Sequence, residues 1–182
     1  QGVHIVIASG RDKNGCKFVY EPLGLENGNH FLALVNGQVV YDFENKEYDL
    51  DDVLTAEDGV KIQKVCKQFG VEGIFQCGYD FYSYISSLNR VKKKVKNAIL
   101  GEPDDYGLKD GKENRNFIDL PFEEIRLTQD INKVIMVHSP RFFEKNFEGI
   151  KAALSDYDVL LIGPDWLEIM PKHVNKASAL WK

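Results

Sequence analysis

A short apolar strand that leads through a turn into a lysine-bearing helix is the strongest constraint on the fold of this chain. The strand contains Leu167 and Ile169 and ends at Pro171, because proline cannot donate a hydrogen bond to a sheet ladder. Asn175 is a favoured N-cap residue, which predicts a helix that begins near Lys176. Lys176 would then lie at a helix N-terminus, where backbone N–H groups and the helix dipole favour an anion. The alternative is a surface lysine that merely follows a turn.

Two further apolar segments end in short polar motifs. The residues from Val3 to Ala8 are mostly apolar and β-branched, which predicts a strand buried on both faces of a parallel sheet, and Ser9-Gly10-Arg11 follows it. A second buried strand is predicted from Phe31 to Val35, and Asn36-Gly37 after it is the usual signal of a tight hairpin. Considered alone, Asn36 is simply a turn residue.

Together these segments resemble motifs of the haloacid dehalogenase-like (HAD) hydrolases, in their Cof-type phosphatase branch. Ser9-Gly10-Arg11 after its strand resembles the second motif, and the segment from Leu167 to Lys176 resembles the third. Asn36-Gly37 is similar to the step at which this branch leaves its core for an inserted cap. His173 stands where the family usually has glycine, and the first and fourth motifs are absent from this chain.

The resemblance implies a phosphatase that forms an aspartyl-phosphate. In that family an aspartate after the first strand attacks the phosphoryl group, a second aspartate acts as acid and base, and Mg²⁺ neutralises phosphate charge. The resemblance makes Ser9 a hydrogen-bond donor to phosphate and Lys176 the group that balances the charge, so these two are the expected catalytic residues. It places Gly10, Arg11 and Asn36 at the phosphate as well. Arg11 could reach the substrate or fix the entry of the following helix.

The nucleophile and the magnesium ligands are expected from the missing motifs, with no metal ligand in this chain. Asp156-Tyr157-Asp158 has the Asp-x-Asp sequence of the first motif but precedes an apolar strand, whereas the nucleophile must follow one. Asp51-Asp52 and Asp104-Asp105 have the wrong spacing, and Pro164 in a short turn explains the Gly-Pro-Asp sequence at 163–165.

The resemblance also predicts an α/β architecture with two parts. Residues 1–42 and 168–182 would form an incomplete, Rossmann-like parallel-sheet core, and residues 43–167 an inserted α+β cap with an antiparallel sheet. The chain opens with Gln1 directly before a strand and stops at Lys182 shortly after Lys176. We therefore expect it to be a piece of a longer protein.

Three segments of the expected cap have distinct patterns. Thr55, followed by Glu57 and Asp58, predicts the start of an amphipathic helix that Gly70 ends. A lysine-rich helix is predicted over 88–99, with its lysines on a solvated face and contact with a membrane or nucleic acid as a minor alternative. The polar residues 102–119 predict a long loop.

Composition excludes several classes of protein. The 182 residues are 43% hydrophobic and 28% charged with a net charge of −5, which is typical of a globular protein and argues against a nucleic-acid scaffold. No apolar run approaches the roughly 20 residues of a membrane helix. The three cysteines are widely spaced, which predicts reduced thiols in a cytoplasmic protein.

The expected function is that of a Mg²⁺-dependent phosphatase of small phosphorylated metabolites, most of all sugar phosphates. A small phosphorylated metabolite is the only expected partner, without nucleic acid or membrane, and the sequence does not indicate an oligomeric state. The alternative is a non-catalytic protein that keeps the fold and the phosphate pocket without the nucleophile.

Overall fold

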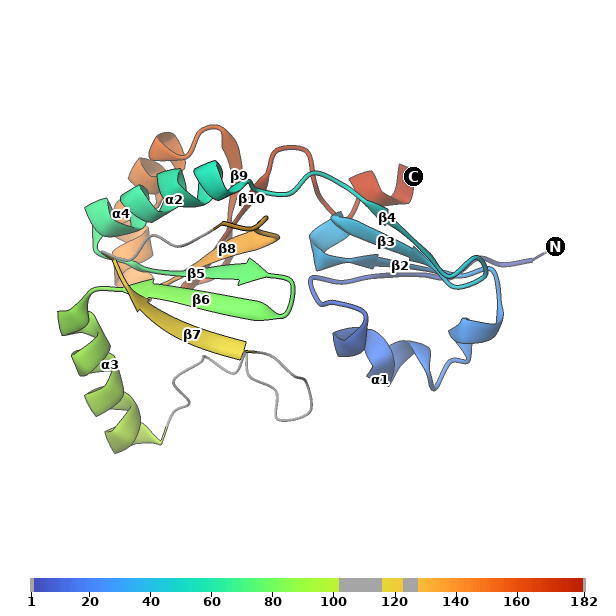
Figure 1. The fold of residues 1–182 in the computed structure, drawn as a ribbon, viewed down its shortest axis with the longest axis horizontal. Helices are drawn as coiled ribbons and strands as arrows, with labels where there is room; N and C mark the ends of the chain where they lie inside the picture. The colour runs from blue at the N-terminus through green and yellow to red at the C-terminus, as the bar shows by residue number, and fades with distance from the viewer. Residues whose placement is uncertain (1, 102–115, 123–127, 182) are drawn as a thin grey trace. The chain divides into compact units, whose positions relative to one another are not determined.

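The chain divides into two compact units. A computed structural model describes residues 2–101, 116–122 and 128–181. Unit 1 combines Gln1–Asp52 with His173–Lys182, and unit 2 is the continuous segment Val53–Lys172 (Figure 1). The predicted boundaries at 42 and 168 differ from this division, because the chain beyond 42 adds another strand to the sheet of unit 1. Likewise, the strand predicted to lead into Lys176 pairs within the sheet of unit 2.

Unit 1 contains a four-stranded mixed sheet. The strands lie in the order β1-β2-β3-β4; β1 and β2 are parallel, and the other neighbours are antiparallel. Their bounds are Val6–Ala8 (β1), Phe31–Leu34 (β2), Val39–Asp42 (β3) and Glu47–Leu50 (β4). Among the described strands of unit 1, the predicted parallel sheet is therefore represented by the pair of β1 and β2 alone.

The strand predicted from Val3 to Ala8 is shorter and more exposed than expected. Only Val6–Ala8 forms β1, and Val3 and Val6 are both exposed. The described neighbour of β1 is β2 alone, so the strand lies at the edge of the sheet. The prediction of burial on both faces is therefore wrong for this structure.

The core of unit 1 combines aliphatic side chains with the aromatic rings of Tyr20, Tyr41 and Phe43. A short helical region packs against the sheet through Cys16 and Tyr20; it consists of η1 (Asn14–Cys16), α1 (Lys17–Tyr20) and η2 (Leu25–Asn27). The ring of Tyr20 lies 5.1 Å from that of Phe43, centroid to centroid, and burial raises the pKa of the Tyr20 phenol to about 12. This small core fixes the sheet whose loops carry the predicted site.

Unit 2 is a six-stranded sheet with two helices packed on one face (Figure 1). The strands lie in the order β7-β6-β5-β8-β10-β9, and every pair is antiparallel except β6 and β7. The strand bounds are Glu72–Cys77 (β5), Asp80–Ile85 (β6), Asn116–Pro121 (β7), Lys133–Val137 (β8), Tyr157–Gly163 (β9) and Trp166–Pro171 (β10). The helices α2 (Ala56–Phe69) and α4 (Pro140–Ala153) cover the sheet.

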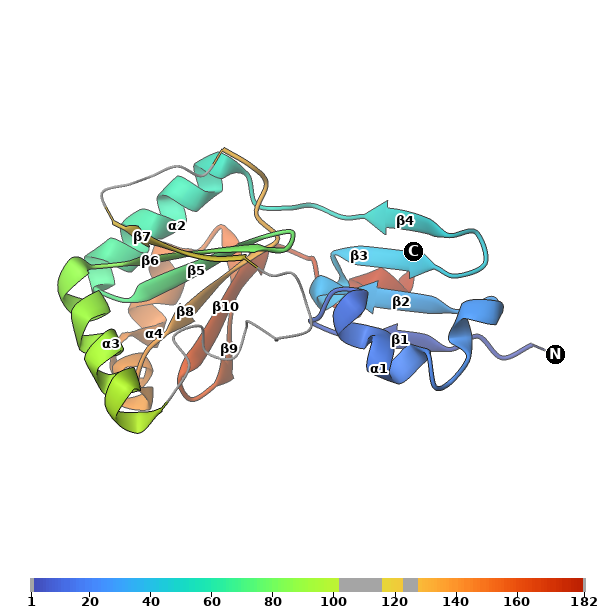
Figure 2. The ribbon, with the colours of Figure 1, turned by 60° about the horizontal axis from the view of Figure 1, so that its bottom comes forward.

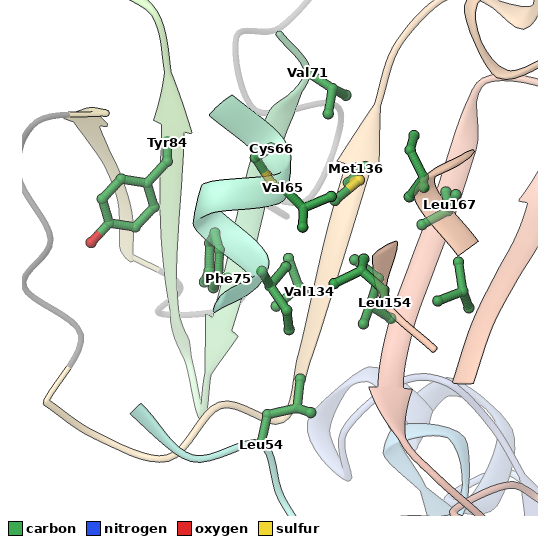
Figure 3. Close-up of a cluster of buried hydrophobic side chains, with 14 of the residues drawn as sticks. Leu54, Val65, Cys66, Val71, Phe75, Tyr84, Val134, Met136, Leu154 and Leu167 are labelled. Carbon is green, nitrogen blue, oxygen red and sulfur yellow. The ribbon is translucent and has the colours of Figure 1, made fainter. Parts of the chain in front are cut away.

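The buried face of α2 supplies much of this core. Its side chains Val65 and Cys66 pack with Phe75, Val134 and other residues of the sheet, as Figure 3 shows. As predicted, the helix starts after Thr55 and ends at Gly70, which has the left-handed conformation. The structure adds that Thr55 and Asp58 form a reciprocal capping box. The Tyr157 hydroxyl donates a hydrogen bond of 2.7 Å to Asp58, which ties the start of α2 to β9.

The lysine-rich helix α3 (Ser87–Leu100) has the opposite orientation to the expected one. Its inward side carries Lys93, which lies 3.0 Å from the buried carboxylate of Glu72. The apolar stripe formed by Leu88, Val91 and Val95 is more than half exposed. The helix itself was predicted correctly, but the ion pair with Glu72 turns a polar face to the sheet.

The loop predicted over 102–119 is partly a strand. Residues 102–115 lie outside the described part of the chain. Residues 116–119 belong to β7, which pairs in parallel with β6 from Asp80↔Asn116 to Ile85↔Pro121. Sequence polarity did not indicate a strand here because the pairing is with a non-neighbouring segment across an intervening helix.

Unit 2 also buries a second ion pair. Lys133 of β8 and Glu168 of β10 are both 7% exposed, and Lys133 Nζ lies 2.7 Å from Glu168 Oε1. The three cysteines, Cys16, Cys66 and Cys77, are buried and form no disulfide bond, as expected for reduced thiols. None of the described helices is long and apolar enough to cross a membrane.

Candidate phosphate-binding site

The first element of the predicted site is the loop that follows β1. The Ser9 N–H donates to Ala33 O at 2.8 Å, which continues the parallel pairing with β2 beyond the strand. The Ser9 hydroxyl oxygen accepts a hydrogen bond of 3.1 Å from the Arg11 N–H. This contact orients the hydroxyl and leaves its proton as a donor. Ser9 and Gly10 are half-buried, while Arg11 is exposed.

Hydrogen bonds join this loop to the turn after β2. The Asn36 N–H donates to Ser9 O, and the Val35 N–H donates to Arg11 O, both at 3.0 Å. Gly10 is closely approached, because a Cβ atom there would lie 2.7 Å from Asn36 Oδ1. The loop after β1 and the turn after β2 are therefore in direct contact, and glycine at position 10 leaves room for the Asn36 amide.

The turn itself has an unusual backbone. Val35, Asn36 and Gly37 all have positive φ angles, of 48°, 60° and 100°. For a β-branched residue such as Val35 this conformation is an outlier, which costs on the order of 1–3 kcal/mol and is most often found at functional sites. The hairpin between β2 and β3 was predicted, but its connection runs from Val35 to Gln38 and is longer than the two-residue turn that Asn36-Gly37 indicated.

The third element is the segment before the final helical turn, η4 (Ser178–Trp181). A Cβ atom on Gly37 would lie 2.1 Å from Asn175 O and 2.9 Å from Lys176 N, so the two backbones are in direct contact. Asn175 is the predicted N-cap: its Oδ1 accepts from the N–H groups of Ala177 and Ser178 at 2.9 and 3.0 Å. These N–H groups are consequently satisfied within the chain. They therefore do not support the predicted anion site at a helix N-terminus. What remains of that prediction is the charge of the exposed Lys176 side chain.

His173 has a backbone conformation that favours glycine, which is the usual residue at this position in the family that the chain resembles. Its φ angle is 69°, in the left-handed region that favours glycine. The turn is nonetheless formed, and the neighbouring Val174 is buried. The departure from the motif therefore places a side chain on a backbone conformation that favours glycine.

The structure brings four of the five predicted residues together by direct contacts and the fifth through the backbone. Ser9, Gly10, Arg11 and Asn36 are linked by the bonds above, and Lys176 adjoins them through Gly37. The approach of the Lys176 ammonium to the Ser9 hydroxyl stays a prediction. For Arg11, the guanidinium lies 5.4 Å above the Phe18 ring, which favours the role of fixing the helix entry.

Acidic residues do not gather at this site in the described structure. Within residues 2–101, 116–122 and 128–181, no three His, Cys, Asp or Glu side chains are placed to hold a metal ion. Asp42 ends β3, but its carboxylate accepts hydrogen bonds from the Glu44 N–H at 2.8 Å and the Asn45 amide at 2.7 Å. The Asn45 bond lowers the pKa of Asp42 and assigns the carboxylate to the turn.

Sequence reasoning missed two cavities, and neither contains a predicted site residue. Unit 2 has a cavity of about 710 Å³ lined by three lysines of α3, Lys92, Lys93 and Lys96, and by Glu72 and His138. Burial lowers the pKa of His138. Unit 1 has a cavity of about 400 Å³ whose lining includes His4 and Asp42. The lysine spacing could have indicated the first cavity only if the inward orientation of α3 had been known.

Comparison with known proteins agrees with the geometry. A model of the family described as haloacid dehalogenase-like hydrolase matches residues 1–182. A Streptococcus pyogenes serotype M6 protein named "Putative phosphatase" is 26% identical over 99% of this chain and 62% of its own length. This chain therefore spans about three fifths of the length of that relative.

Solved structures share the fold. A haloacid dehalogenase-like hydrolase from Bacteroides thetaiotaomicron has a TM-score of 0.67 at 19% identity, over 100% of this chain and 63% of that one. A sugar phosphatase of HAD subclass IIB has a TM-score of 0.64 at 16% identity, over 98% of this chain and 60% of that one.

Proposed function

The chain belongs to the haloacid dehalogenase-like hydrolase family, and from that premise we propose that the protein containing it is a phosphatase of small phosphorylated metabolites. The observation that carries this proposal is the junction of three distant segments: Ser9 and Gly10 contact Asn36, and Gly37 contacts Asn175 and Lys176. A hydroxyl, an amide and an ammonium group from separate parts of the chain are the chemistry that binds a phosphate dianion.

Each residue would have a separate task. The Ser9 hydroxyl, held by the Arg11 N–H, would donate to a phosphate oxygen, and the Asn36 amide would donate to another. Lys176 would offset the negative charge that accumulates when a carboxylate nucleophile approaches the phosphoryl group, a form of electrostatic catalysis commonly worth about 3–4 kcal/mol. The aspartate that forms the aspartyl-phosphate would lie outside this chain.

Members of this family generally depend on magnesium. The described residues do not fit a magnesium site, because they contain no suitable cluster of carboxylates. The roles proposed for this chain therefore concern phosphate binding and charge alone. In this proposal the metal ligands, like the nucleophile, belong to other segments of the longer protein.

Unit 1 would be part of the catalytic core and unit 2 the inserted cap. Two observations support this assignment: unit 1 carries all five predicted site residues, and its two segments enclose unit 2 in the sequence. The similarity of fold to a sugar phosphatase of subclass IIB supports sugar phosphates as the substrate class.

The test is hydrolysis of a generic phosphate ester by the longer protein that contains this chain. Lys176→Ala should lower kcat by about 100- to 1,000-fold. Ser9→Ala should also lower it, whereas Lys172→Ala, which removes a nearby exposed ammonium, should not. Unchanged activity in both site variants would refute the residue assignment.

Assays of the 182-residue chain and of the longer protein distinguish the proposed phosphatase from the alternative, a non-catalytic phosphate-binding protein. The chain alone should show no phosphatase activity, and turnover by it would contradict a nucleophile outside the chain. An inactive longer protein that still binds inorganic phosphate, with affinity lost in Lys176→Ala, would favour the binding protein.

A further inference from the structure

Lys13 lies over the aromatic rings of β3 and β4, although it belongs to the loop that follows β1. Its Nζ atom is 3.5 Å from the centroid of the Tyr41 ring, and 5.8 and 5.9 Å from the centroids of Phe43 and Tyr48. Tyr41 is in β3 and Tyr48 is in β4, the two strands that lie beyond β2 in the sheet of unit 1 (Figure 2). The Lys13 side chain therefore connects the loop after the first strand with the strands farthest from it in that sheet.

The contact has the geometry of a cation–π interaction, in which an ammonium group within about 6 Å of a ring centroid is attracted to the face of the ring. Tyr41 and Phe43 are 6% and 5% exposed, so two of the three rings are shielded from water, which strengthens the attraction. In the described part of the chain no carboxylate forms an ion pair with Lys13. The rings, and not an acid, therefore hold the ammonium group.

The loop held in this way carries Ser9 of the candidate phosphate site. Hydrogen bonds attach the first residues of the loop to the turn after β2: the Asn36 N–H donates to Ser9 O and the Val35 N–H donates to Arg11 O, both at 3.0 Å. Lys13 comes shortly after Arg11, where the chain turns toward the short helical region. Its contact with the rings thus fixes the part of the loop that lies beyond these backbone bonds.

We propose that Lys13 is a positioning residue of the phosphate site, an inference that rests on the function proposed above. Through the rings of Tyr41, Phe43 and Tyr48 it holds the loop after β1 in the conformation that presents the Ser9 hydroxyl. Lys13 is half-buried and its ammonium group faces the rings, so it acts through the loop and not on the phosphate.

The guanidinium of Arg11 holds the same loop in a similar way. It lies 5.4 Å from the ring of Phe18, which belongs to α1. Two cations of one short loop are therefore each placed over an aromatic ring, one on the helix and one on the strands. Lys13 is the one of the two whose contact crosses the sheet, because Phe18 follows closely in the sequence and Tyr41 does not.

Amide hydrogen exchange, measured by NMR in the longer protein that contains this chain, tests the positioning directly. Lys13→Met keeps most of the aliphatic stem and removes the charge. The amide protons of Val35 and Asn36, which bond to this loop, should then exchange about 2- to 30-fold faster, as expected for the loss of a cation–π contact. Lys13→Arg keeps a cation that stacks on aromatic rings and should restore the wild-type rates.

Lys17→Met is the matched control for this experiment, because it removes an exposed ammonium group from the adjacent helix α1. It should leave the exchange of Val35 and Asn36 unchanged. Unchanged exchange in Lys13→Met, or equal acceleration in Lys13→Met and Lys17→Met, would overturn the proposal.

Hydrolysis of a generic phosphate ester by the longer protein shows whether the positioning affects turnover. Lys13→Met should lower kcat about 2- to 30-fold, and Lys13→Arg should recover it. The loss should be smaller than that in Lys176→Ala, because Lys13 acts through the loop. An unchanged kcat in Lys13→Met, or no recovery in Lys13→Arg, would refute the role of the charge.

The two measurements distinguish a failure of this inference from a failure of the proposed function. A longer protein without phosphatase activity would refute the function, and the exchange rates of Val35 and Asn36 would still decide whether Lys13 positions the loop. An active enzyme that loses activity in Lys176→Ala and not in Lys13→Met would refute the inference about Lys13 and leave the proposed function standing.

Discussion

Gly37 lies directly against the backbone of Asn175: a Cβ atom on the glycine would be 2.1 Å from the carbonyl oxygen. The φ angle of Gly37 is 100°, so its conformation and its lack of a side chain are both required. This contact joins the turn after β2 to the segment that carries Lys176. It connects the two segments of unit 1 at the predicted phosphate site.

Gly37→Ala should destabilise unit 1 and displace the Asn175 segment. We expect a loss that exceeds the roughly 1–3 kcal/mol of backbone strain, because the new methyl group also collides with backbone atoms. Gly24→Ala is the matched control: Gly24 has a φ angle of 64° but nothing within 4 Å of its Cβ position. Urea unfolding should show the larger loss for Gly37→Ala, and equal losses would show that the contact does not matter.

His173→Gly should stabilise the chain or leave its stability unchanged. The His173 φ angle of 69° is strained for a side chain, and glycine removes a strain of about 1 kcal/mol while adding a similar entropy to the unfolded chain. His173→Ala keeps the strain and should show no gain. A thermal-unfolding midpoint for His173→Gly well below that of His173→Ala would contradict this account.

Local patterns predicted the long helices α2 and α3 well, and the strand edges and the orientation of α3 poorly. The helix predicted to begin near Lys176 is only the short turn η4. The caps at Thr55 and Gly70 are local signals, so α2 was predicted within its true limits. The inward face of α3 depends on Glu72, a residue on another strand, and could not be inferred from the spacing of its apolar residues.

The residue types of the candidate site could be predicted from the sequence motifs, but not all of its contacts. Ser9, Asn36 and Lys176 were identified by their motif, and the structure supplies the contacts that connect their segments. The positive φ angle of Val35 was not predictable, because its turn contacts a loop distant in the sequence: the Val35 N–H donates to Arg11 O. The use of two N–H groups by Asn175 is local and follows from its predicted role as a cap.

Asp58→Asn should destabilise unit 2 in a manner that depends on pH. Burial alone would raise the pKa of Asp58, but hydrogen bonds from Tyr157 and Thr55 lower it below its ordinary value of 3.8. A lowered pKa stabilises the fold at pH values above 3.8, and this stabilisation disappears as the pH falls toward the pKa of the folded state. At neutral pH we expect a loss of about 1–2 kcal/mol.

Unfolding of the Asp58→Asn variant and of the wild type should be compared from pH 7 down to pH values below 3.8. The difference between them should shrink at the acid end. Glu57→Gln, which removes a carboxylate from the same helical turn, is the control and should show a smaller effect. A difference independent of pH would contradict the role of the ionised carboxylate.

Lys133→Met should strongly destabilise unit 2, because it leaves the buried carboxylate of Glu168 without its partner at 2.7 Å. Removing one partner of a buried pair typically costs about 3–5 kcal/mol. Lys133→Met combined with Glu168→Leu should recover much of that loss. Lys61→Met, at an exposed lysine 3.6 Å from Asp58, should change the free energy of unfolding by less than about 1 kcal/mol. A double variant no more stable than Lys133→Met would refute the explanation.

The division of unit 1 into two segments has a consequence for the order of folding. Unit 2 is a continuous segment, so a ribosome completes it before His173–Lys182 emerges. The contact between Gly37 and Asn175 can form only afterwards, and it closes a very long loop. Prior folding of unit 2 would shorten the flexible part of that loop and reduce the entropy lost on closure. The predicted phosphate site should accordingly be among the last parts of the chain to form.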